Sequence, residues 1–288
     1  MSFPGVPYEL EYLLSIIDFS SYKDNSSGKM AQKVICFYDI GESYLQDILN
    51  SLESHLSRSF PNLEFSYRVS HKCCLYSIEY RYNTQKESLE FLSAFHDEFK
   101  GIKKEIGNNI IFDSEDSLES FFIKKLNENK LTLSVCDSFL RGALKGFIEH
   151  DSLSSIVMQS SLNFHQEELL RVFQLPLERV PEKEELQAML FKLQGMIQAR
   201  ALIFELGLRK KENYYVARLF ITFDSLDLNF ERLKLCFQEV KIFDFETQDT
   251  HMKIGIYLEL PYKDFLPLDT IRNRLLLDTI IVLSLLIE

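Results

Sequence analysis

Strand-like and helix-like segments alternate along most of this chain, and that alternation restricts its fold more than any other feature. From Gln32 to about Lys130, three short apolar or alternating segments are each followed by an amphipathic helical stripe. This order predicts a small α+β domain with the succession β-α-β-α-β-α. The three strand-like segments are VICFYDI, CLYSIEY and NNIIF, and the last of the stripes has its apolar positions at Leu118, Phe121, Phe122 and Leu126.

The pattern restarts at Leu131 with longer elements, which predict an α/β domain built on a layered sheet. The segment 224–250 is the hardest part of the chain to place. The predicted strands lie at 131–136, 156–157, 201–206, 215–223 and 252–260, and the predicted helices at 138–149, 164–174 and 182–199 and at the C-terminus.

Composition and charge exclude several classes of function. The net charge of −11 repels a phosphate backbone, so we expect no nucleic-acid binding through a basic face. The six histidines are scattered without ligand spacing, and 10 Gly and 7 Pro argue against phosphate-cradling loops, so neither a metal nor a cofactor is expected. Five cysteines without a CxxC spacing, and an N-terminus without a signal-peptide pattern, predict reduced thiols in a cytoplasmic protein.

The most apolar segment, LLLDTIIVLSLLI, covers Leu275–Ile287. Its 13 residues are fewer than the roughly 20 that a membrane-spanning helix needs, and Asp278 interrupts it. We therefore predict a buried helix and no membrane partner.

The stretch LTLSVCDSFLRGAL, Leu131–Leu144, has the pattern of a buried strand that ends in a polar corner before a helix. An α/β enzyme displays a nucleophile at such a corner, and Ser138 lies there. The alternative is that Ser138 is the N-cap of the following helix, a role that serine often fills.

The order of motifs along the chain resembles that of the CinA family of competence/damage-inducible proteins. Five segments carry the resemblance, and together they cover nearly the whole chain. They are FPGVPYELEYLL near the N-terminus, VICFYDIGESYLQDIL at Val34–Leu49, the run GNNIIFDSEDSLESFFIKKLNENKLTLSVCDS, the helix FHQEELLRVFQLP, and the pair Arg272 and Arg274 before the terminal helix.

The resemblance implies a remnant N-terminal segment and linker at 1–29, a KH-like domain at 30–112 and a three-layer α/β/α domain at 113–288. In the family, the last of these hydrolyses the amide of nicotinamide mononucleotide to nicotinate mononucleotide and ammonia. A pyridine nucleotide is thus the implied ligand, and the implied assembly is a homodimer. The family's N-terminal domain, linked to ADP-ribose hydrolysis, is expected to be missing.

The same resemblance implies that Ser138 aligns with the family's serine, that Asp137 keeps the acidic residue before it, and that Gly142 keeps one glycine after it. Phe139 and Leu140 stand where the family has small residues, and these side chains would crowd a nucleotide.

Two further family motifs are also altered. Phe164 aligns with a tyrosine and Leu169 with a lysine, so the hydroxyl and the proton acceptor are lost, although His165 could substitute as a base. The glycine-rich turn becomes ELGLRKKENYY, a basic turn that either attracts a phosphate or simply faces water. Its three basic residues are Arg209, Lys210 and Lys211.

These losses predict a degenerate amidase domain in a protein that works by binding or scaffolding. The competing hypothesis is a nicotinamide mononucleotide amidohydrolase with Ser138 as nucleophile and a base supplied from elsewhere. The two differ in whether a base reaches Ser138 at the mouth of an open pocket.

Overall fold

The structure is a computed structural model, and it describes most of the chain from Lys29 to Ile287. The N-terminal motif FPGVPYELEYLL and the short strand expected at 156–157 lie outside the described residues. The described ranges are 29–38, 40–69, 73–116, 118–149, 158–176, 178–194, 200–224, 230–237, 240–246 and 252–287.

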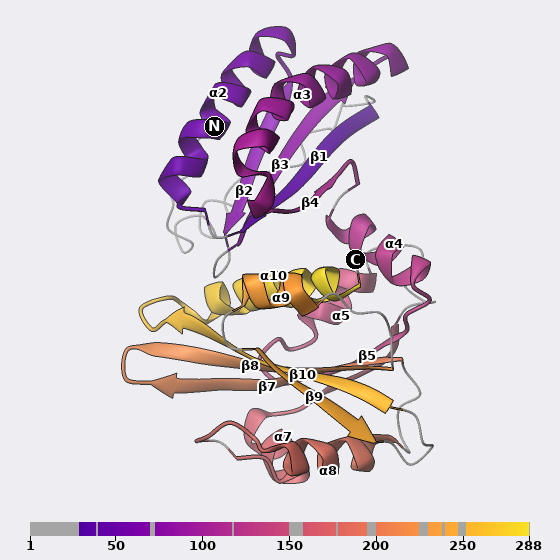
Figure 1. Ribbon diagram of the computed structural model, residues 1–288, viewed down its shortest axis with the longest axis vertical. Helices are drawn as coiled ribbons and strands as arrows, with labels where there is room; N and C mark the ends of the chain where they lie inside the picture. The colour runs from indigo at the N-terminus through magenta and orange to yellow at the C-terminus, as the bar shows by residue number, and fades with distance from the viewer. Residues whose placement is uncertain are drawn as a thin grey trace, which may run out of the picture.

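The first half of the chain forms a four-stranded antiparallel sheet with the strand order β2-β3-β1-β4 (Figure 1). The connectivity β-α-β-β-α-β is a split βαβ arrangement. The elements are β1 (Lys29–Tyr38), α2 (Glu42–Ser59), β2 (Leu63–Val69), β3 (Cys73–Tyr82), α3 (Gln85–Ile106), the 3₁₀ turn η2 (Gly107–Asn109) and β4 (Ile110–Ser114). The sequence prediction omitted β2, and the KH-like assignment and its boundaries stay predictions.

Side-chain alternation gives this sheet two different buried faces. On β1, Ile35 and Phe37 pack under α2 and α3, together with the apolar side of those helices. Val34 and Cys36 point the other way and join the core of the second half of the chain. The two halves therefore share a hydrophobic core rather than being linked by a hinge alone.

The second half forms a six-stranded mixed sheet with the order β6-β5-β7-β8-β10-β9. β5 pairs in parallel with β6 and β7, and the remaining pairs are antiparallel. The strands are β5 (Leu133–Asp137), β6 (Met158–Asn163), β7 (Ala201–Lys211), β8 (Tyr214–Asp224), β9 (Val240–Glu246) and β10 (Met252–Lys263). The segment that was hardest to place, 224–250, contains β9 and the short helix α9 (Phe230–Cys236).

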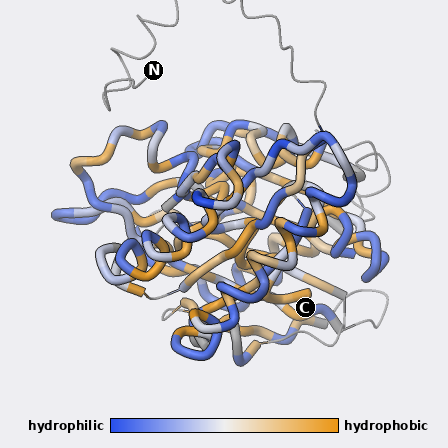
Figure 2. Tube along the Cα trace, turned by 90° about the horizontal axis from the view of Figure 1, so that it is seen from above, coloured by the Kyte–Doolittle hydropathy of each residue, from blue (hydrophilic) through white to orange (hydrophobic). Residues whose placement is uncertain are grey.

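Helices cover both faces of this second sheet, which confirms the predicted α/β class (Figure 1). On one face lie α5 (Ala143–Glu149), α9 and α10 (Leu268–Leu286), with α4 (Leu118–Glu128) beside α10. On the other lie α7 (Gln166–Phe173) and α8 (Lys183–Gln194). Seen from above, hydrophobic segments run through the interior and hydrophilic ones lie mainly at the periphery (Figure 2).

Helix α10 is the buried helix that the apolar segment predicts. It lies between the two sheets, and Ile281 and Leu285 belong to the core cluster that contains residues from both halves of the chain. Asp278, at 0% exposure, accepts a hydrogen bond from the Tyr262 hydroxyl at 2.5 Å, which explains how a carboxyl is tolerated there. Among the described helices, none has the length and hydropathy needed to cross a bilayer.

Candidate functional site

Ser138 lies at the corner immediately after β5, where the sequence placed it. The helix after this corner, however, begins only at Ala143, and the backbone at Arg141 and Gly142 takes positive φ values of 51° and 80°. These left-handed residues turn the chain before any helix can form. The predictions that a helix starts at Ser138 and that Ser138 caps it are therefore wrong.

The carboxylate of Glu205, from β7, occupies this corner. Its Oε2 accepts hydrogen bonds from the backbone N–H groups of Ser138 at 3.0 Å, Phe139 at 2.5 Å and Leu140 at 3.2 Å. Its Oε1 accepts the N–H of Gly207 at 2.5 Å. We call these four N–H groups the backbone cradle. Successive N–H groups that converge on one point bind anions, and here the anion belongs to the protein itself.

A β-bulge in β7 places Glu205 in the cradle. The register with β8 shifts between Glu205 and Leu208, and Gly207 takes a φ of +83° within the shift. The side-chain amide of Gln166 holds the bulge, because it donates to the Leu208 carbonyl at 2.7 Å and accepts the Leu208 N–H at 3.1 Å. A Cβ at Gly207 would lie 2.3 Å from Gln166 Cδ, so the bulge needs glycine for both conformation and space.

Burial dominates the electrostatics of Glu205 and Asp137. Both side chains are fully buried. Burial raises the pKa of Glu205, and the hydrogen bonds from the backbone cradle oppose that shift. Burial likewise raises the pKa of Asp137 to about 6. The Gly142 N–H, which donates to both carboxylate oxygens at 3.1 and 3.2 Å, opposes this shift. Asp137 therefore serves to fix the corner, with Gly142 as its partner.

The hydroxyl of Ser138 does reach a carboxylate. Ser138 Oγ donates to Glu205 Oε2 at 3.3 Å. This distance exceeds the roughly 2.5–3.0 Å usual for a hydroxyl donor, so the contact is weak. The same oxygen already accepts three backbone hydrogen bonds. Ser138 thus has a neighbour of the right chemical type in a poor geometry for taking its proton.

The residues that follow Ser138 close the corner. Leu140 is fully buried in the core beneath α10, and Phe139 packs partly buried against that core. Arg272, in the second turn of α10, donates from Nε to the Phe139 carbonyl at 2.8 Å, and its guanidinium lies 5.0 Å from the centre of the Phe139 ring. A ligand approaching Ser138 would meet this ring and guanidinium.

Phe164, His165 and Leu169 lie at the neighbouring edge. The Phe164 N–H donates to the Asp137 carbonyl at 2.9 Å, so Phe164 does lie beside the corner. Leu169 is fully buried in the core under α7. His165 is an exposed residue at the start of α7, and among the described contacts none joins it to Ser138.

The basic trio lies in β7, not in a turn as the sequence suggested. The turn between β7 and β8 is confined to 212–213. Arg209 is buried, donating to the Glu178 carbonyl at 2.7 Å and pairing with Glu259 at 3.0 Å. Lys211 approaches Glu259 at 3.7 Å, and Lys210 lies 5.8 Å from the centre of the Tyr215 ring. A role of Arg209, Lys210 and Lys211 in phosphate binding stays a prediction, and Arg209 is already engaged within the protein.

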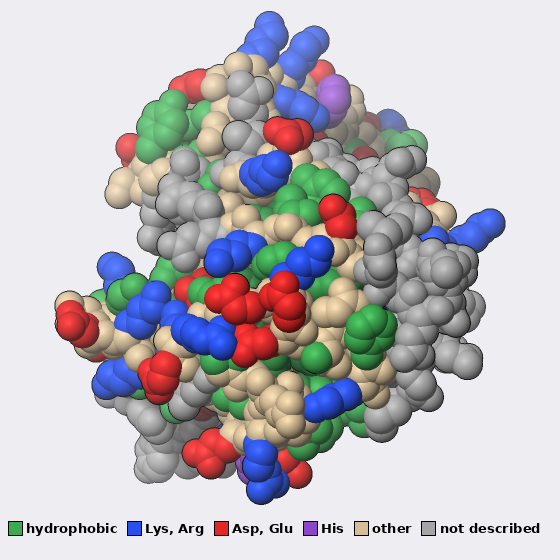
Figure 3. Space-filling model, turned by 60° about the horizontal axis from the view of Figure 1, so that its bottom comes forward, with side chains coloured by type: hydrophobic (Ala, Val, Ile, Leu, Met, Phe, Trp, Pro, Cys, Tyr) green, Lys and Arg blue, Asp and Glu red, His purple; other side chains and the backbone are tan. Residues whose placement is uncertain are grey.

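Beyond this corner, the described residues show no metal-type cluster, and one face of the molecule carries charges of both signs. No group of three His, Cys, Asp or Glu side chains that could hold a metal ion occurs in the described ranges. On the face shown in Figure 3, Lys and Arg side chains are interspersed with Asp and Glu.

Glu205 is the site residue that the sequence analysis missed, although its signal was present. It interrupts the apolar run ALIFELGL, and a charge inside a buried strand needs hydrogen-bond partners. A glycine two residues later, which permits a bulge, completes the signal.

Comparison with known proteins finds relatives that are named competence-damage inducible or CinA-like and that match only part of this chain. A competence-damage inducible protein of Clostridium perfringens is 25% identical over 171 residues, which cover 57% of this chain and 38% of that one. Another, from Thermoanaerobacter pseudethanolicus, is 28% identical over 49% of this chain and 32% of its own length. A CinA-like protein of Prochlorococcus marinus is 26% identical over 59% and 38%. The matches thus span only about a third of the length of these relatives.

Solved structures give a weaker likeness. The CinA superfamily protein KP700603 of Klebsiella pneumoniae superimposes with a TM-score of 0.35 at 11% identity, covering 58% of this chain and 93% of that one. The competence/damage inducible protein CihA of Agrobacterium tumefaciens gives 0.33 at 13% identity, with 58% and 93% covered. No protein-family model matches the chain.

Proposed function

The chain belongs to the CinA family of competence/damage-inducible proteins, and from that premise we propose that it is a member whose amidase-like site has lost hydrolysis. The protein then works by binding or scaffolding. The observation that carries the proposal is Glu205, which occupies the backbone cradle next to Ser138.

Amide hydrolysis through a serine needs donors for the negative charge that develops on the carbonyl oxygen. The N–H groups nearest Ser138 are the natural donors at such a corner, and they already bind the Glu205 carboxylate. A substrate oxygen could use them only by displacing a buried negative charge, which would have no other hydrogen-bond donors as good. The cradle therefore favours a static role over a catalytic one.

The deprotonation of Ser138 meets a related obstacle. Burial raises the pKa of Glu205, but its carboxylate already accepts hydrogen bonds from four backbone N–H groups, so little of its accepting capacity is left for the Ser138 proton. Leu169, at the position of the family's lysine, has no proton-accepting atom. Among the described contacts, only Glu205 accepts a hydrogen bond from Ser138 Oγ, and at 3.3 Å this bond is too long for efficient proton transfer.

An ammonia-release assay tests the proposal. Wild type and Ser138→Ala are incubated with nicotinamide mononucleotide, and Ser66→Ala, at an exposed serine on β2, controls for the loss of a hydroxyl elsewhere. We expect all three to release ammonia at the rate of the buffer. A rate above buffer in wild type and in Ser66→Ala that disappears in Ser138→Ala would refute the proposal.

The second candidate is the amidohydrolase itself, and one observation favours it. Ser138 Oγ lies 3.3 Å from Glu205 Oε2, so a shortening of this contact on substrate binding would make a serine–carboxylate pair. In that case Glu205→Gln would abolish ammonia release as completely as Ser138→Ala. Under the leading proposal neither substitution changes the rate.

A further inference from the structure

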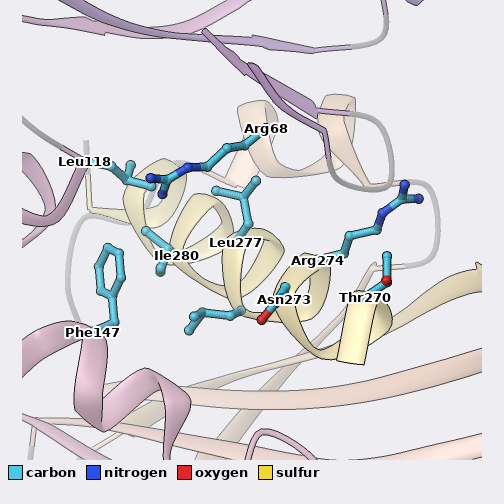
Figure 4. A pocket seen from close by; sticks show the side chains of 9 residues that line it. Arg68, Leu118, Phe147, Thr270, Asn273, Arg274, Leu277 and Ile280 are labelled. Atoms are coloured by element: carbon cyan, nitrogen blue, oxygen red, sulfur yellow. The ribbon is translucent and has the colours of Figure 1, made fainter. Parts of the chain in front are cut away.

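A groove separates the first sheet from α10, away from the Ser138 corner (Figure 4). Its volume is about 550 Å³, within the range of pockets that hold small molecules. The described residues that line it come from β2, from the starts of α4 and α10, from α5 and from the middle of α10. The groove therefore exists only because the two halves of the chain pack together.

The floor of the groove is apolar. Leu277 and Ile280 rise from α10, with Leu118 at one end and Phe147 of α5 at the side (Figure 4). Leu277 and Ile280 are 8% and 1% exposed, so the floor is a firm part of the core. A floor of this kind favours an apolar ligand body.

Two guanidinium groups border this apolar floor. On β2, the side chains alternate, so that Phe65 and Tyr67 face α2 and α3 while Arg68 faces the groove. Arg68 extends across the groove toward Leu118, and Arg274 stands at the opposite end (Figure 4). Over the described part of the chain, neither arginine has an ion-pair or hydrogen-bond partner, and no Asp or Glu lines the groove.

Among the described residues that line the groove, no acidic side chain competes with a ligand for these guanidinium groups. Arg68 is exposed and Arg274 is half-buried, so a ligand can reach both guanidinium groups and form charge-assisted hydrogen bonds with them. The planar fork of a guanidinium matches a carboxylate or a phosphate. The exposed side chain of Asn273 and the hydroxyl of Thr270 add hydrogen-bonding groups at the rim.

We propose that this groove binds a small amphipathic anion, with its carboxylate or phosphate on Arg68 and its alkyl or aryl body on Leu277 and Ile280. Arg274 strengthens the positive potential from the far end. The ligand bridges the two halves of the chain, because Arg68 belongs to the first sheet and the apolar floor to α10.

The groove is independent of the proposed loss of hydrolysis. Arg272 contacts the Ser138 corner, whereas Arg274, two residues on, lines the groove. Residues two apart on a helix point to nearly opposite sides, since each residue turns it by about 100°. Ligand binding can therefore fail or succeed whatever the ammonia-release assay shows.

Calorimetric titration of the full chain tests the proposal with four eight-carbon probes. Octanoate and octyl phosphate carry the two anionic heads, 1-octanol is the neutral match and octylammonium the cationic one. The variants are Arg68→Gln and Arg274→Gln, and the control is Arg171→Gln, at an exposed arginine on α7. All three sites lie outside the tightly packed core, so the variants should fold.

We expect the anions to bind at least about tenfold more tightly than 1-octanol, because charge-assisted hydrogen bonds exceed neutral ones by about that factor. Arg68→Gln should weaken anion binding about tenfold and leave octanol binding unchanged, Arg274→Gln should weaken it less, and Arg171→Gln not at all. Whichever of octanoate and octyl phosphate binds more tightly identifies the preferred head group. Equal binding of octanoate and 1-octanol, equal effects of Arg68→Gln and Arg171→Gln, or no binding of either anion would overturn the proposal.

A second measurement locates the binding. The chain contains no tryptophan, so Asn273→Trp places a single indole at the rim of the groove. Saturating octanoate should shift its fluorescence, whereas a single indole at the distant hairpin, Tyr214→Trp, should not respond. A response only from Tyr214→Trp would place the ligand elsewhere and contradict the assignment.

Discussion

Replacing Glu205 with alanine removes the one acceptor shared by the backbone cradle. Four buried N–H groups then lose their partner. Each unsatisfied buried donor costs about 1–3 kcal/mol, and water entering the space recovers part of that cost. Removing a buried charge offsets a further part, since burial raises the pKa of Glu205. We therefore expect Glu205→Ala to lower the free energy of unfolding by about 4 kcal/mol.

The emptied cradle should accept a small anion in place of the lost carboxylate. Formate or acetate at about 100 mM is expected to restore part of the lost stability, because it supplies the same acceptor atoms. Urea unfolding, followed by far-UV circular dichroism, gives the free energies in acetate and in chloride of equal ionic strength. Leu206→Ala is the matched control, since it empties an equally buried but apolar site next door.

Two outcomes would refute this reasoning. A loss of less than about 1 kcal/mol in Glu205→Ala would mean that the cradle does not depend on the carboxylate, since each donor alone is worth that much. Equal effects of acetate on Glu205→Ala and on Leu206→Ala would mean that no anion site has been emptied.

Three further substitutions test the corner and the sheet. Gly207→Ala should cost about 3 kcal/mol in urea unfolding, because it strains a φ of +83° and displaces the Gln166 amide, whereas Gly101→Ala on α3 should be neutral or stabilising. Asp137 has a pKa raised from 3.8 to about 6, so the stability it contributes is complete below pH 4 and is lost as pH rises through 6. Relative to wild type, the free energy of unfolding of Asp137→Asn should therefore rise by up to about 3 kcal/mol as the pH increases from 4 to 8. A difference between the two proteins that stays constant with pH would contradict this. Gly255→Ala should cost about 1–3 kcal/mol, since its Cβ would lie 2.2 Å from a phenylalanine ring carbon on β9; unchanged unfolding would show that the ring moves freely.

Much of the fold could be predicted because the spacing of apolar residues and the length of each helix or strand are local properties of the sequence. The α/β class, the strand before Ser138 and the buried helix α10 follow from apolar spacing alone. The strand β2, LEFSYRV, also alternates in the way expected of a half-buried strand, and it was overlooked because it lies between two longer elements.

The site was less predictable because it depends on contacts between distant segments. Ser138 and Glu205 are 67 residues apart, and β5 and β7 bring them together as neighbours in the sheet. The late start of α5 follows from the left-handed backbone at Arg141 and Gly142. No periodicity in the sequence encodes either feature.

The central claim is that Glu205, rather than a substrate, occupies the backbone cradle. Amide NMR signals of Ser138, Phe139, Leu140 and Gly207 report on it directly, because a hydrogen bond to a carboxylate moves each of them downfield. Nicotinamide mononucleotide at saturating concentration should leave all four signals in place, and Glu205→Gln should shift them without any ligand. Movement of the four signals in wild type on addition of the nucleotide would contradict the account.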